Sequence, residues 1–294
     1  MTSSTTSPFR GPATHPLRRA AGLLLACTSA IAVVAGCSTD SSVADGELTG
    51  LLALSPGQFT DGTLTGSWFK MVQPGGTADK GPFMPNGDSP VEGGSVTLLQ
   101  PGSEGGLRLG GYQSEPKPGF REGNSLSGSI MKPTRFFGVE FGTSTNPVDP
   151  QTGHKVAAPT VSNSDGTLSG QLVSWAASWN NQEFNQGAPK APAKVGAQVP
   201  GSAEAKRAWD WVRKEWLQQD DVVSGTGPAA TGTLAEDGKS YTLSWTSSIV
   251  GGPFNGFTGV WHLEGDYRPE DTAPSDTAPV ATTPVDPTPT SGTR

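Results

Sequence analysis

The sequence predicts a mainly β protein: a single antiparallel barrel or sandwich of about eight strands, with one inserted amphipathic helix. Three observations predict this class. The 294-residue chain holds 40 glycines and 26 prolines, and only 16% of its residues are charged. Short runs that alternate β-branched or aromatic residues with small or polar ones recur between turn signals. We expect one folded domain over residues 48–267, since about 220 residues can enclose one sizeable core.

Eight runs have the alternation that is typical of strands. They are residues 64–72, 95–99, 107–113, 125–131, 135–142, 167–175, 241–249 and 258–265. Asp61-Gly62 and Asp165-Gly166 precede two of these runs. Because glycine tolerates positive φ, each Asp-Gly pair predicts a tight turn that leads into a strand.

One segment, residues 202–220, has the pattern of a helix. Ser202 can cap its start, and Ala205, Trp209, Val212 and Trp216 follow at spacings of four, three and four. This spacing places the four apolar residues on one face. Prolines before the segment and glycines after it indicate an insertion between strands.

The N-terminus has the form of an export signal over residues 1–36: a polar start, an apolar run at 20–34, and then small residues. A helix over that run would span only about 22 Å, whereas the hydrocarbon core of a bilayer is about 30 Å thick. A cleaved signal peptide is therefore favoured over a permanent membrane helix.

The signal closes with Val34-Ala35-Gly36-Cys37, which resembles the lipobox of bacterial prolipoproteins. The resemblance implies cleavage before Cys37, acylation of its thiol with diacylglycerol (palmitate), and a location on the extracytoplasmic face of the cell membrane. Residues 37–47 are then a flexible tether. Residues 268–294 consist largely of Pro, Thr, Ala, Asp and Ser, so we expect a disordered tail.

Cleavage would change both the charge and the cysteine content of the domain. The signal contains three arginines and one of the two cysteines, Cys27, so the mature chain keeps 17 basic against 27 acidic residues. A net charge near −10 repels phosphates, and we expect no nucleic-acid partner. With Cys37 acylated, disulfides and cysteine catalysis are excluded from the mature domain.

Residues 64–69 and 95–114 resemble the first three strands of the avidin family, which opens with a Thr-Gly-x-Trp pattern. The resemblance implies an eight-stranded up-and-down barrel. It also implies a biotin site that would carry over to Tyr112 and Ser114. Lys70 stands where that family has an asparagine.

Residues 175–187 interleave aromatic side chains with amides, and a second Phe-Asn pair precedes the last predicted strand. An amide both donates and accepts hydrogen bonds, which suits sugar hydroxyls, and an aromatic face covers the sugar's C–H surface. Alternatively, the tryptophans belong to the core and the amides bind loop backbone. The candidate ligand site comprises Trp175, Trp179, Asn180, Asn181, Gln182, Asn185, Gln186, Phe254 and Asn255, together with Tyr112 and Ser114.

Catalytic residues are scarce. The mature chain has two histidines, His154 and His262, without a Ser-His-Asp order or a His-x-x-x-His pair. Glu140 and Glu183 are the acidic residues nearest to aromatic strand residues and leave open a glycosidase-type enzyme. We expect a lipid-anchored, extracytoplasmic, non-catalytic binding protein for a cell-envelope glycan or small polar ligand, with no cofactor or metal. The alternative is a structural or protein-interaction module of the envelope.

Overall fold

The computed structural model describes residues 43–190, 208–210, 215–217 and 227–269. The predicted signal peptide with Cys37, and the tail after residue 269, lie outside the described residues. Within the described ranges, no helix has the length and apolar character needed to cross a membrane.

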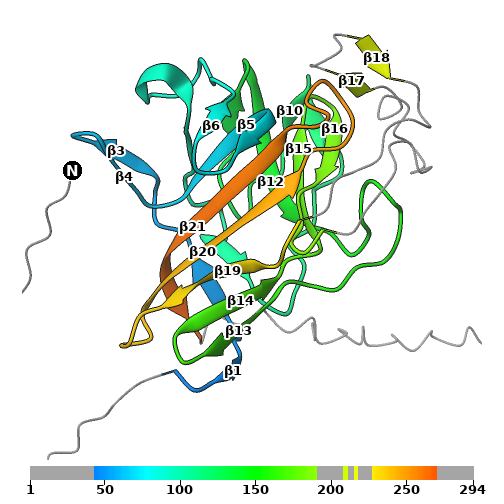
Figure 1. The fold of residues 1–294 in the computed structure, drawn as a ribbon. Helices are drawn as coiled ribbons and strands as arrows, with labels where there is room; N and C mark the ends of the chain where they lie inside the picture. The colour runs from blue at the N-terminus through cyan, green and yellow to red at the C-terminus, as the bar shows by residue number, and fades with distance from the viewer. Residues whose placement is uncertain (1–42, 191–207, 211–214, 218–226, 270–294) are drawn as a thin grey trace, which may run out of the picture. The chain divides into compact units, whose positions relative to one another are not determined.

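The fold is mainly β, as predicted, and its large sheet is an antiparallel, curled half-barrel (Figure 1). The longest strand, β21 (Thr258–Arg268), pairs along one edge with β20 (Ser240–Ser248). Its other edge pairs with β5 (Trp68–Thr77) and then with β2 (Leu51–Ala53). The sheet order is β1 (Gly46–Glu47), β13 (Thr160–Ser164), β14 (Thr167–Gln171), β19 (Ala230–Leu234), β20, β21, β2 and β8 (Gly106–Arg108), and β5 also pairs with β6 (Gly81–Phe83) and β7 (Thr97–Leu98).

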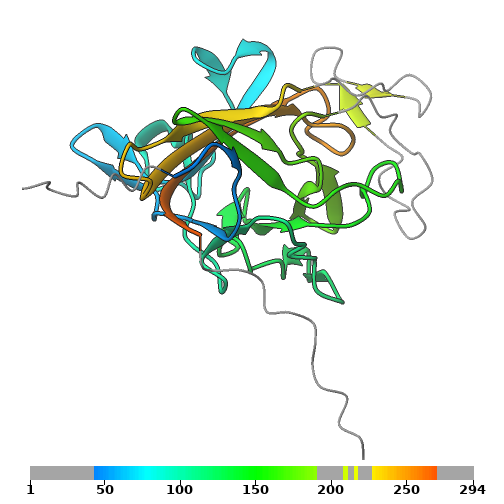
Figure 2. The same cartoon turned by 90° about the horizontal axis from the view of Figure 1, so that it is seen from below.

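A second sheet has the order β11 (Thr134–Phe136), β12 (Val139–Thr145), β15 (Trp175–Trp179) and β16 (Gln182–Asn185). It packs on the inner face of the large sheet, where the ring of Trp175 lies 5.2 Å from that of Trp245 and 5.5 Å from that of Trp261. The blue-green segment between β8 and β12 lies on the same side, below the yellow and orange strands in Figure 2. It includes the hairpin of β9 (Phe120–Arg121) and β10 (Asn124–Ser125). Elsewhere, β3 (Gln58–Thr60) and β4 (Thr63–Thr65) form another hairpin, and Glu92–Gly94 is a 3-10 turn.

Tight turns define much of the topology. Five hairpins of the described chain have two-residue turns in which both residues have positive φ, as a type I′ turn requires. They are Asp61-Gly62, Glu122-Gly123, Phe137-Gly138, Asp165-Gly166 and Asn180-Asn181. The turns predicted at the two Asp-Gly pairs are thus confirmed. The single strand predicted over 135–142 is wrong, because the turn at Phe137-Gly138 divides it into β11 and β12.

The helix predicted over 202–220 is not supported where the structure describes that segment. Residues Ala208–Asp210 (β17) and Glu215–Leu217 (β18) are short strands that pair antiparallel, with Trp209 opposite Trp216. A spacing of seven residues fits two helical turns, but it equally places two tryptophans opposite each other in a hairpin. Tryptophan also has high strand propensity.

Candidate functional site

An aromatic cavity lies between the two sheets. Its volume is about 50 Å³, or about 430 Å³ when the space of its open mouth is included. The enclosed volume of about 50 Å³ is well below the about 300–1,000 Å³ of ordinary ligand pockets, so a ligand of that size would have to displace a lining side chain. The lining comes from β5, β11, β12, β15, β16, β21 and the loop between β20 and β21. Its aromatic members are Phe69, Phe136, Phe141, Trp179, Phe184, Phe254 and Trp261.

The period of two along the strands explains why one face of the small sheet is apolar. In β15, Ala177 and Trp179 face the cavity, while the intervening Ser178 faces the other side of the sheet. Ala177 pairs with Phe184 of β16, which also lines the cavity. The methyl group of Ala177 is short, so space remains between the larger rings around it.

The single amide in the lining already has protein partners. The Gln186 Oε1 accepts a hydrogen bond from Trp261 Nε1 (3.3 Å), and its Nε2 donates to the backbone carbonyls of Asn185 (3.0 Å) and Ser248 (3.2 Å). The other lining residues present hydrocarbon, the Met71 thioether or an aromatic ring. The indole N–H of Trp179 donates to the Phe136 carbonyl (2.8 Å). The cavity is therefore suited to apolar groups and poorly suited to hydroxyls, which would lose their hydrogen bonds with water.

A cluster of aromatic rings borders the cavity. Phe254 is 7% exposed, and its ring centroid lies 5.4 to 5.8 Å from those of Trp179, Phe136 and Phe137. Phe137 is 41% exposed and has a φ of 52°. The left-handed conformation costs a residue with a Cβ about 1–2 kcal/mol. Asp88 stabilises this turn, because its Oδ2 accepts the Gly138 N–H at 2.7 Å.

A polar network covers the opposite face of the small sheet. The carboxyl groups of Glu115 and Glu183 are hydrogen-bonded to each other, and Asn146 Nδ2 donates to Glu183 Oε1 (3.4 Å). Burial, followed by the hydrogen bond and charge of Glu183, raises the pKa of Glu115 to about 8. The Ser178 hydroxyl also bonds to Glu115 and lies 2.6 Å from the Ser125 Oγ. Glu115 is therefore largely protonated near neutral pH.

Sequence reasoning singled out Glu183 but missed Glu115, because the two residues are far apart in the chain and share no local motif. The other candidate, Glu140, lies elsewhere, on β12 opposite Arg135.

A buried lysine lies beside this network. Lys190 is 3% exposed, and its Nζ donates to the carbonyls of Asn185 (2.8 Å) and Ser248. Asn185 in turn donates from Nδ2 to Asp149 Oδ2 (2.6 Å). Burial lowers the pKa of Lys190 to about 7, although the charge of Asp149 opposes the shift. These groups bind one another and the backbone.

The predicted ligand site divides into several environments. Trp179, Gln186 and Phe254 line the cavity, whereas Trp175 is 1% exposed and belongs to the core. Asn185 belongs to the buried polar network.

The remaining predicted residues do not line the cavity. Asn180 and Asn181 form the exposed turn between β15 and β16, and Gln182 follows them at the start of β16. The Asn255 Oδ1 accepts the Gly251 N–H within its own loop (3.0 Å). For these turn and loop residues, the structural interpretation is the better one.

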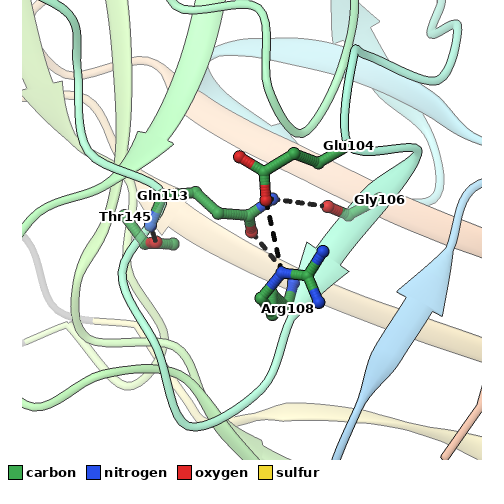
Figure 3. Close-up of polar contacts among 5 residues, drawn as sticks. All are labelled: Glu104, Gly106, Arg108, Gln113 and Thr145. Carbon is green, nitrogen blue, oxygen red and sulfur yellow. Dashed lines mark hydrogen bonds and ion pairs between the residues drawn. The ribbon is translucent and has the colours of Figure 1, made fainter. Parts of the chain in front are cut away.

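Tyr112 and Ser114 are both exposed, and the Tyr112 hydroxyl donates to the Val156 carbonyl (2.6 Å). Gln113, between them, is buried, and Figure 3 shows its polar contacts. Its Oε1 accepts the Arg108 N–H (2.9 Å) and its Nε2 donates to the Gly106 carbonyl (2.9 Å). Gln113 thus fixes the segment together with the Tyr112 hydroxyl.

The histidines lie away from the cavity lining. His154 is exposed. The Nδ1 of His262 lies 2.8 Å from Ser244 Oγ, and its ring stacks on Trp68. Among the described residues, no group of three or more His, Cys, Asp or Glu side chains could hold a metal ion.

No protein-family model, curated protein or solved structure matches this chain.

Proposed function

We propose that the protein is a lipid-anchored, extracytoplasmic binding protein whose ligand is a small, mainly apolar molecule. The observation that carries this proposal is the aromatic cavity, whose polar groups are already bonded within the protein. An apolar ligand loses little on leaving water and gains contact with rings on several sides. A sugar would have to leave its hydroxyls without partners in this cavity.

The anchor rests on the lipobox resemblance at Val34-Ala35-Gly36-Cys37. Two or more acyl chains on one cysteine hold a protein durably on a bilayer, whereas one chain alone binds only marginally. Cys37→Ser should release the protein from the membrane fraction of a bacterial host or leave the uncleaved precursor. Unchanged membrane association and normal cleavage would contradict the anchor without affecting the cavity.

Ligand uptake can be tested with the neutral fluorescent probe N-phenyl-1-naphthylamine. The folded domain should enhance the probe's fluorescence in a saturable way and transfer energy to it from tryptophan. Ala177→Leu should block this binding, because the larger side chain fills the cavity. Ala235→Leu makes the same change at an exposed position and should leave binding unchanged.

The result that would overturn the cavity proposal is equal probe binding by the wild type and Ala177→Leu, with both folded by circular dichroism. Saturable quenching by envelope sugars that Ala177→Leu does not alter would also count against it. That outcome would favour a polar ligand at another surface.

A further inference from the structure

The rings at the edge of the cavity form two layers. Phe254 is almost fully buried and lines the cavity, while Phe137 is exposed and does not. The two rings are in contact, with centroids 5.6 Å apart. Phe137 therefore lies outward of Phe254, on the solvent side.

The backbones that carry these rings differ in how they are held. Phe254 lies in the loop between β20 and β21, where Gly251, Gly252 and Gly256 all have positive φ. The base of the loop is closed by a hydrogen bond from the Ile249 N–H to the Phe257 carbonyl (2.7 Å). Within the loop, the Gly256 N–H donates to the Ile249 carbonyl (2.9 Å) and the Phe257 N–H to the Phe254 carbonyl (3.1 Å), so movement of the Phe254 ring requires rotation of its side chain and no change in the strand pairing.

The hairpin tip that carries Phe137 is held by its neighbours. Asn86 Nδ2 donates to the Arg135 carbonyl (3.0 Å), Asp88 accepts the Gly138 N–H, and Trp179 donates to the Phe136 carbonyl. These contacts keep a bulky residue at a turn position where Asn, Asp or Gly is usual. A backbone outlier that its surroundings maintain is a feature of functional sites.

We infer that Phe254 and Phe137 form an aromatic gate, in which the Phe254 ring occupies the place of a ligand ring until a ligand displaces it. The inference rests on the proposed binding function. Displacing Phe254 would add the space of one phenyl ring to the cavity, beside Trp179 and Phe136. The preferred ligand is accordingly a neutral, mainly apolar compound that inserts one aromatic or cyclic hydrocarbon ring at this place. Phe137 sets how fast that ring exchanges with solvent.

The test measures association and dissociation rates of N-phenyl-1-naphthylamine by stopped-flow fluorescence. Phe137→Asn keeps the left-handed turn while removing the outer ring, and should raise both rates at least several-fold with a smaller change in Kd. Phe137→Tyr retains the ring and should match the wild type. Phe254→Ala should tighten binding, because no internal ring then competes with the probe.

Several outcomes separate the two proposals. In one outcome, the wild type binds the probe saturably and Ala177→Leu blocks this binding, but Phe137→Asn leaves the rates unaltered and Phe254→Ala does not increase the affinity. That outcome overturns the gate and leaves the binding function standing. Binding that appears only in Phe137→Asn or Phe254→Ala would show a site created by the substitution and would overturn both. An absence of saturable binding in the wild type and in both gate variants overturns both.

Discussion

The indole N–H of Trp179 donates a hydrogen bond to the backbone carbonyl of Phe136 across 2.8 Å, and so joins the small sheet's two hairpins beside the cavity. Trp179→Phe would keep an aromatic ring near Phe254 but leave that carbonyl without this donor. We expect a loss of about 1–2 kcal/mol in the free energy of unfolding, measured by urea denaturation. An unchanged denaturation midpoint would show that water replaces the bond.

The raised pKa of Glu115 predicts a stability that depends on pH. The folded-state pKa is about 8, against an ordinary value of 4.5. The folded protein therefore binds more protons than the unfolded chain between these values, and this contribution to stability falls as pH rises from about 4.5 to 8.

Glu115→Gln should remove that dependence, because the amide stays neutral throughout the window. Urea midpoints at several pH values between 5 and 8 provide the measurement. Glu122→Gln, in the exposed turn between β9 and β10, is the matched control and should keep the wild-type slope. A slope that survives in Glu115→Gln would assign it to other groups.

The lowered pKa of Lys190 predicts that its contribution to stability rises with pH above neutral, opposite to that of Glu115. Its pKa is lowered to about 7 from an ordinary value of 10.5. The unfolded chain then binds more protons than the folded protein between pH 7 and 10.5, so the contribution of Lys190 to stability increases as pH rises across that window. Lys190→Met should be most favourable relative to the wild type near pH 6 and progressively less so toward pH 10. Parallel stability curves for the two proteins would contradict a depressed lysine pKa.

The close packing of the backbone around Gly232 leaves no room for a side chain. A Cβ built there would overlap with the Thr242 carbonyl oxygen of the paired strand β20. Gly232→Ala must therefore push β19 away from β20, at a cost of about 1–3 kcal/mol in thermal or urea unfolding. Gly87→Ala is the comparison, since a Cβ at residue 87 would meet no atom within 4 Å. Equal stability of the two variants would refute the close approach.

The sequence predicted the mainly β class and the Asp-Gly turns because both depend on local patterns. The turn at Phe137-Gly138 was not predicted, because phenylalanine seldom occupies a left-handed turn position and an apolar residue in an alternating run indicates a strand. At 202–220, the tryptophan spacing fitted a helix as well as a hairpin. Distinguishing the two depends on contacts that a local pattern does not specify.

The candidate site was predicted in part. The aromatic and amide segment does border the cavity, but alternation along β15 and β16 divides its residues between two faces. Trp179 faces the cavity, while Asn185 faces the polar network. The Glu115–Glu183 pair depends on the way in which a distant loop covers the sheet, and no sequence spacing records that arrangement.

The side chain of Gln113 has a consequence beyond its own loop. Its side-chain amide forms hydrogen bonds with the outward-facing backbone N–H of Arg108 and carbonyl of Gly106, as the backbone of an additional strand would do (Figure 3). Exposed strand edges recruit other chains and lead to aggregation. On the proposed lipid anchor, copies held on one bilayer would meet each other often, and this blocked edge would help to keep them from polymerising through β8.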